Sequence, residues 1–587
     1  MSKLDFIVLF GGEAGYGVMS AGAMLARAAA RNNLQATVVN EYPSLIKGGL
    51  NNCLVRFSDS PLTSYEENLD VLGAVSQQAY ELNVGKVKPG GVVFHDVGVK
   101  TDKVTPPPGV ILVAVPLIQP GPGEMSKVMA NSAVLGAFCA LTDFWAEAVK
   151  SVIRGEFANP AVQEKNLAIF EQTWQKVQES KPLSGSVRFP FAMKPSPAPC
   201  MLLTGNDAIA MGAIQAGCRF AAGYPMTPST SILVYMADHA VEYGLVFKQS
   251  EDEIAAVNML IGAGFAGVRA MGATSGGGFS LMTEAVGFAA MAEVPLVLVM
   301  GQRGGPSTGL PTRTMQGDLN QVLYASQGEF ARVVVAPGDV EECFTETFRV
   351  FNLAEKYQVP CIILTDKYLA DTSVTQLFFD TQGMKVDRGR LVDEAWLATH
   401  QPYFRYRLTE DGVSERALPG QAGGRHVATS YTHGEDGFYS SGHKEYAGDE
   451  PAVTAAGIDK SFAKLPHILA EVPGIKLHGP DQADLTLIAW GSTKGAALEA
   501  IELAKEKGIS VNLLQILYAS PFPAAEAAKV LAKAKRTLLI EGNHTAQMGS
   551  LLRSHTGLSA DSKYLKYDSK SFTPSGILRK IEEVMAK

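Results

Sequence analysis

Short apolar runs alternate with longer Ala-rich stretches along most of the chain. Apolar runs bounded by turn residues are typical of buried strands, and the longer stretches are typical of helices that cover a sheet. Residues 1–180 follow this alternation, which predicts an open parallel sheet. The strands expected there are Phe6–Phe10, Ala36–Asn40, Val92–Phe94 and Val110–Val113.

Two segments of different composition interrupt this pattern. Residues 181–200 hold five prolines and predict a stiff linker. Residues 376–480 are rich in charge, Gly, His and Tyr and predict an extended connecting region. Residues 201–375 and 481–587 resume the alternation, so we expect an α/β fold with three α/β domains. The strands expected in the central block are Phe220–Ala222, Leu296–Met300, Ala331–Val335 and Cys361–Thr365.

The composition excludes several classes of protein to which this chain could belong. Hydrophobic residues make up 46% and charged residues 19%, as expected for a chain that buries several cores. The 51 Lys and Arg against 59 Asp and Glu give a net charge of −8, and no basic run predicts nucleic-acid binding. No stretch reaches the about 18 apolar residues that a membrane helix needs. We expect a soluble, cytoplasmic protein that binds neither nucleic acid nor membrane.

The cysteines are scattered, with no two closer than 18 positions. This spacing excludes the paired-cysteine motifs of zinc and iron–sulfur sites, and it predicts buried thiols in a reducing compartment. We expect no metal site in this chain. The cysteines are Cys53, Cys139, Cys200, Cys218, Cys343 and Cys361.

Glycine clusters near the N-terminus are candidate contacts for an anionic cofactor. The first lies between the first strand and a helix, where backbone N–H groups can meet a phosphate. Its spacing differs from the dinucleotide fingerprint, and tight packing of strand on helix explains it equally well. The second cluster is explained equally well as a turn whose charged side chains are solvated. The candidates are Gly12, Gly15, Gly17, Lys47, Gly48 and Gly49.

In the central block, Gly- or Pro-rich loops follow successive predicted strands. Because the carboxyl ends of parallel strands share one edge of a sheet, these loops are expected to converge there on a ligand. Arg303 and Arg313 lie on the last of these loops, and Arg suits a carboxylate, although surface loops often carry arginines. The other candidates are Tyr224, Pro225, Thr227, Ser275 and Gly276.

Glu253 has two interpretations. Ser250 and Glu253 have the spacing of a capping box, and acids in a first turn suit the helix dipole. A buried glutamate at a helix start can also hold a proton against a heteroaromatic nitrogen. The local pattern does not choose between these.

Missing signatures exclude other enzymes. The chain has no GxxxxGK[ST] or HExxH motif, which argues against P-loop nucleotidases and zincin metalloproteases. It also has no GDG motif followed by Asn, the Mg²⁺–diphosphate signature of thiamine enzymes. A self-contained thiamine enzyme is therefore not expected.

The chain resembles the α subunit of 2-oxoacid:ferredoxin oxidoreductases. The resemblance rests on GYPMTPST, SEDEIAAVNMLIGAGFAG, ATSGGGFSLMTEAVGFA and GQRGGPSTGLPTRTMQGDL, and in the C-terminal block on AWGSTKGAALEA, SPFP and LLIEGNHTAQMGSLLR. The N-terminal block resembles the family's γ subunit, fused ahead of α. The chain is most similar to the 2-oxoglutarate branch.

This resemblance implies a γ-type domain at 1–180, a pyrimidine-binding thiamine-diphosphate domain at 201–375 and a transketolase C-terminal-like domain at 481–587. Glu253 would bind N1′ of the aminopyrimidine and act as the catalytic acid–base residue. Thr227 would contact the substrate near its reacting carbonyl, and Arg313, or less closely Arg303, would bind its carboxylate. The remaining implied cofactor contacts are Tyr224, Pro225, Ser275 and Gly276, with the two N-terminal glycine clusters for coenzyme A.

The implied reaction is reversible, CoA-dependent oxidative decarboxylation of 2-oxoglutarate to succinyl-CoA and CO₂. A β subunit would supply the Mg²⁺–diphosphate site and a [4Fe-4S] cluster and pass electrons to ferredoxin, in an αβ or (αβ)₂ assembly. In reverse, the enzyme would fix CO₂. Two alternatives stay open: the same chemistry on pyruvate, branched-chain or aryl 2-oxoacids, and a non-catalytic acyl-CoA-binding subunit.

Overall fold

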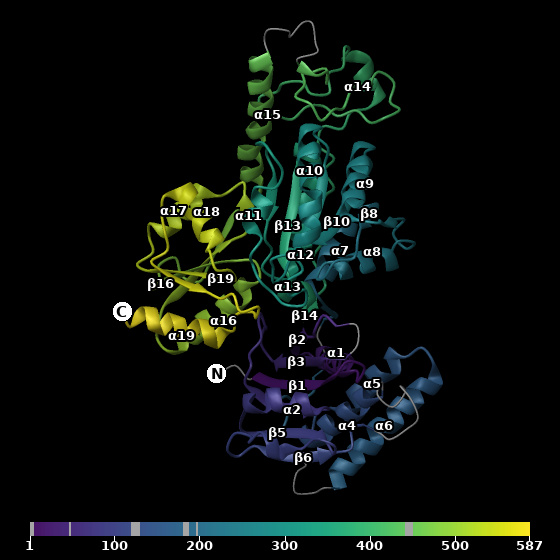
Figure 1. Ribbon diagram of the computed structural model, residues 1–587, viewed down its shortest axis with the longest axis vertical. Coiled ribbons are helices and arrows are strands. Elements are labelled where there is room, and N and C mark those ends of the chain that lie inside the picture. The colour runs from purple at the N-terminus through teal and green to yellow at the C-terminus, as the bar shows by residue number, and fades with distance from the viewer. Residues whose placement is uncertain (1–4, 46–47, 119–128, 180–186, 195–197, 441–449) are drawn as a thin grey trace. The chain divides into compact units, whose positions relative to one another are not determined.

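The computed structural model describes residues 5–45, 48–118, 129–179, 187–194, 198–440 and 450–587. The chain divides into two compact units, each described by itself (Figure 1). Unit 1 comprises residues 1–204, 371–378 and 573–575, and unit 2 comprises the rest. Residues 181–186 and 195–197 of the predicted linker, 181–200, fall outside the described residues.

Unit 1 is built on an eight-stranded sheet with the order β6-β5-β4-β1-β3-β2-β14-β7. Its strands are β1 Asp5–Glu13, β2 Gln35–Glu41, β3 Leu50–Ser58, β4 Leu69–Ala74, β5 Val87–Asp96, β6 Ile111–Val115, β7 Cys200–Leu203 and β14 Ser373–Leu377. Its helices are α1 Val18–Ala30, α2 Gln77–Asn83, α4 Ala130–Thr142, α5 Ala146–Glu156 and α6 Pro160–Glu179, with short 3₁₀ turns at Val84–Lys86 and Thr101–Lys103.

The sheet of unit 1 is mixed, which corrects the expected parallel sheet. Strands β1, β4, β5 and β6 run parallel, but β3 is antiparallel to both β1 and β2. Only residues 42–49 join β2 to β3. A parallel crossover needs a dozen or more residues, so this short connection can only produce antiparallel neighbours.

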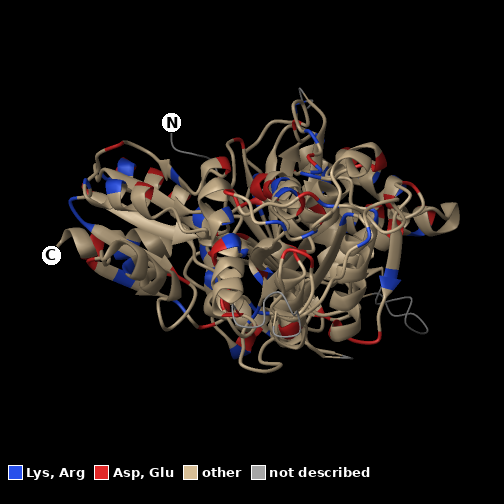
Figure 2. Ribbon diagram, turned by 90° about the horizontal axis from the view of Figure 1, so that it is seen from above, with Lys and Arg blue, Asp and Glu red and all other residues tan. Residues whose placement is uncertain are grey.

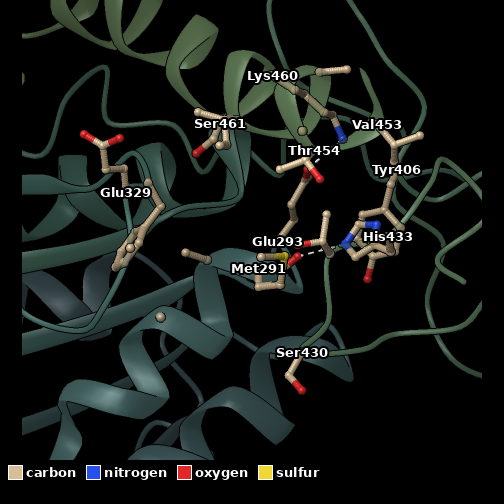
Figure 3. A pocket seen from close by; sticks show the side chains of 18 of the residues that line it. Met291, Glu293, Glu329, Tyr406, Ser430, His433, Val453, Thr454, Lys460 and Ser461 are labelled. Carbon is tan, nitrogen blue, oxygen red and sulfur yellow. Dashed lines mark hydrogen bonds and ion pairs between the residues drawn. The ribbon is translucent and has the colours of Figure 1, made fainter. Parts of the chain in front are cut away.

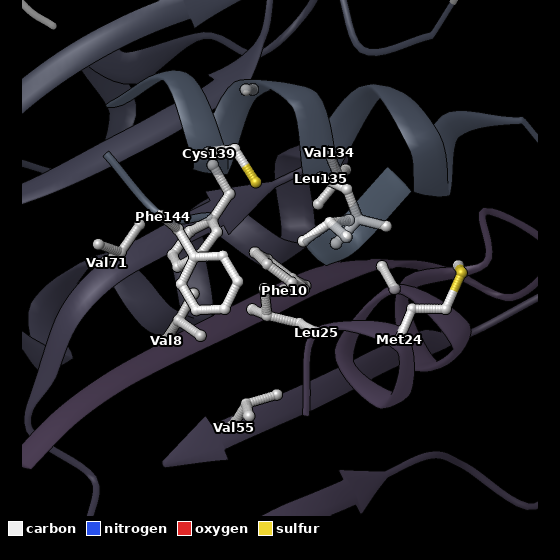
Figure 4. Close-up of a cluster of buried hydrophobic side chains, with 14 of the residues drawn as sticks. Val8, Phe10, Met24, Leu25, Val55, Val71, Val134, Leu135, Cys139 and Phe144 are labelled. Carbon is white, nitrogen blue, oxygen red and sulfur yellow. The ribbon is translucent and has the colours of Figure 1, made fainter. Parts of the chain in front are cut away.

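One hydrophobic core stabilises unit 1. Alternate residues of β1, such as Val8 and Phe10, lie in one buried cluster with Leu25 of α1 and Leu135 of α4 (Figure 4). Cys53 and Cys139 are fully buried, and burial raises the pKa of the Cys53 thiol to about 12. These thiols are core residues, as the scattered cysteines predicted.

Unit 2 holds a seven-stranded sheet with the order β18-β12-β13-β11-β10-β8-β9 and a five-stranded sheet with the order β15-β17-β16-β19-β20. The strands of the larger sheet are β8 Phe220–Gly223, β9 Val246–Gln249, β10 Ala270–Ser275, β11 Leu296–Gln302, β12 Val333–Val335, β13 Pro360–Asp366 and β18 Tyr518–Ser520. Those of the smaller sheet are β15 Ile475–His478, β16 Leu485–Trp490, β17 Val511–Ile516, β19 Thr537–Glu541 and β20 Ser562–Leu565.

Helices flank these two sheets, except that the one at Glu394–Thr399 lies away from both (Figure 1). They are α7 Gly205–Gln215, α8 Thr230–Asp238, α9 Glu253–Phe265, α10 Gly276–Met291, α11 Leu319–Leu323, α12 Val340–Tyr357, α13 Lys367–Asp371, α14 Glu394–Thr399, α15 Glu450–Glu471, α16 Thr493–Glu506, α17 Ala524–Leu531, α18 Gln547–Thr556 and α19 Pro574–Met585. One core cluster includes Leu298 of the larger sheet and Ile488 of the smaller sheet, so the two sheets of unit 2 are packed together.

The segment between the two sheets is anchored by buried charges. Glu355 of α12 accepts hydrogen bonds from Arg269 Nε at 2.7 Å and Arg416 Nη2 at 2.6 Å, and Arg388 Nη2 lies 2.7 Å away. The segment expected to be extended also contains the helix α15. Buried ion pairs thus hold residues 380–420, which have little regular structure, against α12.

Lys, Arg, Asp and Glu are interspersed along the ribbon, without a basic stripe in the part of the chain that is described (Figure 2). Among the described residues, no helix is long and apolar enough to cross a membrane. No group of three His, Cys, Asp or Glu side chains that could hold a metal ion occurs in these ranges either.

Candidate active site

The loops after β8, β9, β10 and β11 meet at one edge of the larger sheet, as the sequence predicted. Strands β9, β8, β10, β11 and β13 are all parallel, so their carboxyl ends share that edge. Hydrogen bonds join neighbouring loops: Ser250 N donates to Gly223 O at 3.1 Å, and Ser275 Oγ donates to Gly301 O at 2.7 Å. A ligand at this edge would therefore meet a preassembled set of loops.

The loop after β8 is held from two sides. Arg303 Nη1 donates to Thr227 O at 2.8 Å, and Ser229 Oγ donates to Thr274 O of β10. Ser229 precedes α8 but makes no cap hydrogen bond, because its hydroxyl is used in this link to β10. Tyr224 is 41% exposed at the rim, next to the exposed Pro225, so both side chains are accessible to a ligand or a partner.

Glu253 is the first residue of α9 and is only 3% exposed. Asp252 caps the helix by accepting from Ala255 N at 2.7 Å, whereas Ser250 Oγ donates to Asp252 O. The capping-box interpretation, one of the two that the sequence left open for Glu253, is therefore wrong. Asp252 supplies the cap, and the Glu253 carboxyl is left for another purpose.

The Glu253 carboxyl faces the first turn of α10. A Cβ on Gly278 would overlap both Glu253 Oε1 and Thr274 Oγ1, so only glycine leaves room for this carboxyl. Within the described residues, Glu253 Oε1 is buried and has no hydrogen-bond partner. A buried oxygen without a partner costs about 1–3 kcal/mol, so this atom fits a donor group on a ligand.

Ser275 and Gly276 close the same edge. Ser275 is buried and its hydroxyl joins β10 to β11, so its side chain supports the site rather than facing it. Gly276 begins α10, and Asp318 Oδ2 lies 3.3 Å from the position that a Cβ would take on Gly276. Asp318 lies in the same sequence motif as Arg303 and Arg313 but is not among the predicted site residues.

Arg303 and Arg313 belong to one compact loop. Gly304 N donates to Arg313 O at 3.1 Å, and Arg313 N donates to Leu310 O at 3.0 Å. Both side chains are partly exposed. This places two guanidinium groups on the same loop at the ligand edge, the arrangement expected for a substrate with carboxylate groups.

The smaller sheet anchors this loop through Gln316. Its side chain donates to Trp490 O at 2.9 Å and accepts from Gly542 N at 2.8 Å, and Asn543 Nδ2 donates to Gln316 O at 2.9 Å. Thr314 Oγ1 also donates to Asp366 Oδ1 at 3.0 Å. The C-terminal block therefore positions the loop that carries Arg313, a role that the sequence did not suggest.

The two glycine clusters of unit 1 lie together. Ala14 N donates to Gly49 O at 3.0 Å, which joins the loop of Gly12, Gly15 and Gly17 to the loop of Gly48 and Gly49. A Cβ on Gly12 would lie 3.2 Å from both Val18 Cγ1 and Val75 Cβ, so this glycine permits packing.

Gly15 and Gly48 face open space, since a Cβ added to either would meet no atom within 4 Å. These two positions are the accessible members of the clusters. The remaining candidate, Lys47, lies outside the described residues.

A cavity of about 630 Å³ lies at the other end of α10, away from these loops (Figure 3). Glu293 beside it lies 2.6 Å from Lys460 Nζ and 3.6 Å from both Lys464 Nζ and Arg405 Nη1. Burial alone would raise the pKa of Glu293, but these cations lower it to about 2. Burial lowers the pKa of Lys464 to about 8. This cluster joins α15 to the end of α10.

Family models match most of the chain. Residues 211–440 match the thiamine-diphosphate-binding domain of pyruvate flavodoxin/ferredoxin oxidoreductases. Residues 7–176 match a pyruvate ferredoxin/flavodoxin oxidoreductase model, and residues 483–568 match core domain II of pyruvate:ferredoxin oxidoreductases.

Relatives match all or part of the chain. The 2-oxoacid:ferredoxin oxidoreductase subunit alpha of a Sulfolobus species is 30% identical over an alignment 636 residues long, gaps included. This alignment covers 100% of this chain and 97% of that relative. The 2-oxoglutarate synthase subunit KorA of Methanothermobacter thermautotrophicus is 36% identical over 65% of this chain and 97% of its own length.

A solved structure agrees with these matches. The 2-oxoglutarate:ferredoxin oxidoreductase from Magnetococcus marinus, with 2-oxoglutarate, coenzyme A and succinyl-CoA bound, is 32% identical and superposes with a TM-score of 0.90 over 99% of this chain and 100% of that one. With a thiamine-diphosphate-binding domain whose loops converge on a buried glutamate, this chain belongs to the family of 2-oxoacid:ferredoxin oxidoreductase α subunits.

Proposed function

We propose that this chain catalyses, with a β subunit, the CoA-dependent oxidative decarboxylation of 2-oxoglutarate to succinyl-CoA and CO₂. Two electrons pass singly to two ferredoxins, and the reverse reaction fixes CO₂. The observation that carries this proposal is Glu253, whose buried Oε1 lacks a partner among the described residues and lies beside Gly278. The similarity to the Magnetococcus marinus enzyme over 99% of the chain supports the choice of substrate.

When bound, thiamine diphosphate would supply the nucleophilic carbon that this chemistry needs. The part of this chain is to hold the aminopyrimidine ring. Glu253 Oε1 would share a proton with N1′ of that ring, which favours the imino form that acts as the base. Tyr224, Pro225, Thr227 and Gly276 would form the walls around the ring, with Ser275 holding β10 against β11.

Thr227, Arg313 and Arg303 would orient the substrate. Thr227 lies partly exposed on the loop after β8, and the Arg303 side chain holds this residue through its carbonyl. Arg313 would bind a carboxylate through paired N–H donors. A dicarboxylic oxoacid has one more carboxylate than pyruvate, so a site with two arginines suits 2-oxoglutarate.

The other binding sites of the proposed enzyme are assigned to a partner subunit and to unit 1. A β subunit would hold the diphosphate, Mg²⁺ and the [4Fe-4S] cluster, and would transfer electrons to ferredoxin in an αβ or (αβ)₂ assembly. The glycine clusters at Gly12–Gly17 and Gly48–Gly49 would contact coenzyme A. We assign residues 1–180, 201–375 and 481–587 to the γ-type, pyrimidine-binding and transketolase C-terminal-like domains, with 376–480 as the connecting region.

The test is CoA-dependent reduction of a one-electron dye by the purified complex, with 2-oxoglutarate, pyruvate and 2-oxoisovalerate offered in parallel. We expect turnover with 2-oxoglutarate and little with the others. Arg313→Ala should raise the KM for 2-oxoglutarate about 10- to 100-fold, as for loss of a charged hydrogen bond worth about 1.5–3 kcal/mol.

Preference for another oxoacid would overturn the proposed substrate. An unchanged KM in the Arg313 variant would remove that residue from substrate binding. A thiamine-loaded complex that oxidises none of the three would contradict the proposed activity and favour a binding subunit.

A further inference from the structure

The backbone around Asp318 is fixed from several elements. Asp318 N donates to Gln302 Oε1 at 3.1 Å, at the end of β11. On either side, Gln547 of α18 donates to Gly317 O at 2.7 Å and accepts from Asn320 N at 3.0 Å. Asp318 therefore occupies a defined position at the ligand edge.

The fold does not use the Asp318 carboxyl. Asp318 precedes α11, yet its side chain makes no cap hydrogen bond. Within the described ranges it makes no other side-chain hydrogen bond, and no ion pair of 4.0 Å or less joins it to Arg303. Its Oδ2 instead faces Gly276 at the start of α10, beside the first turn that Glu253 also faces. An acid placed at a ligand edge without a structural partner is available to a ligand.

Burial makes the neutral form of Asp318 easier to reach than it is for a carboxyl in water. Burial raises the pKa of Asp318 to about 6, and the positive charge of Arg303 limits this rise. Arg303 is the charged group that acts on the Asp318 carboxyl, whereas Gln302, which accepts from Asp318 N, and Gln547, which bonds to Gly317 and Asn320, are neutral. The other carboxyl at the first turn of α10 is Glu253, which lies beside Gly278.

We propose that Asp318 binds the 2-oxoacid in its protonated form, donating its O–H to a substrate oxygen next to the guanidinium of Arg303. This inference rests on the proposed function and adds a specificity residue to it. A 2-oxoacid carries only acceptor oxygens, so an ionised Asp318 would repel it, whereas the neutral acid adds a donor. Substrate binding should therefore take up a proton.

The test uses the full-length chain in its thiamine-loaded complex and measures KM and kcat for 2-oxoglutarate from about pH 6 to about pH 8. In the wild type, KM should rise by up to about tenfold for each pH unit above the pKa of Asp318. Asp318→Asn keeps a donor at every pH, so its KM should stay low and flat. Asp318→Ala should have a high KM throughout.

Asp238→Asn provides the control, because Asp238 lies at the end of α8, away from the ligand edge, and should keep the wild-type profile. A second measurement needs no variant. Titration calorimetry with 2-oxoglutarate, in two buffers of different ionisation enthalpy, should show uptake of close to one proton by the wild type at about pH 8.

A KM that is independent of pH in an active wild-type complex would overturn the role of Asp318 and leave the proposed function intact. The same holds if Asp318→Asn follows the wild-type profile, or if no proton is taken up on binding. A wild-type complex that oxidises no 2-oxoacid would overturn both proposals.

Discussion

At the scale of single residues, the site depends on a carboxyl and the space left for it. Glu253 is buried at the start of α9, and a Cβ on Gly278 would overlap its Oε1. The sequence alone allowed two roles for Glu253: a buried acid that holds a proton against a ring nitrogen, or a residue that caps a helix. The structure separates the two, because Asp252 accepts the cap hydrogen bond from Ala255 N.

Gly278→Ala should therefore damage activity more than folding. The added methyl must displace the Glu253 carboxyl, and we expect a loss of kcat of about 100-fold, the scale of general acid–base catalysis. Strain from overpacking should cost about 1–3 kcal/mol of unfolding free energy. Dye-reduction kinetics and urea unfolding measure the two effects.

Gly277→Ala is the matched control. An added Cβ there meets only Met226, at 4.0 Å, and alanine favours a helix over glycine by about 1 kcal/mol. Its kcat should stay within about twofold of the wild type. Equal kinetics in the two variants would show that the space beside Glu253 is not needed for turnover.

At the scale of elements, α15 is tied to α10 by one buried carboxylate among three cations. Glu293→Gln keeps the shape but leaves Lys460, Lys464 and Arg405 uncompensated. Breaking a buried ion cluster in this way should lower the unfolding free energy by about 3–5 kcal/mol. Urea unfolding followed by circular dichroism measures the change.

Glu284→Gln on α10 is the control, because Glu284 is not among the buried charges and its loss should change stability by less than about 0.5 kcal/mol. A Glu293 variant as stable as this control would mean that the three cations are satisfied without the carboxylate.

The elements also show what the sequence can and cannot predict. Apolar runs in the sequence correctly predicted the positions of β8, β11 and β13, because strands that are buried on both faces are continuously apolar. Strand direction in unit 1 was mispredicted, since it depends on the short link between β2 and β3. The pairing of β14 with β2 joins residues far apart in sequence, and no local pattern encodes such a contact.

The same limit applies to the site. The loops that follow parallel strands could be placed at one edge from the alternation alone. Asp318 was missed because its significance comes from its position beside Gly276 and Arg303, which depends on tertiary packing. The anchoring of Gln316 by Trp490 and Gly542 was hidden for the same reason.

At the scale of the whole molecule, the proposed function assigns to this chain one part of an active site. It has the buried glutamate and the two arginines, but its sequence has no Mg²⁺–diphosphate motif. We therefore expect the isolated chain to be inactive and the complex with a β subunit to be active.

The most direct test compares Glu253→Gln with Glu251→Gln in the assembled, thiamine-loaded complex, by CoA-dependent dye reduction with 2-oxoglutarate. Glu251 is an exposed acid two residues away, so its variant should keep the wild-type kcat. Glu253→Gln should lose about 100-fold or more in kcat while the complex stays assembled. Wild-type turnover by the Glu253 variant would contradict the assignment of the thiamine site to this chain.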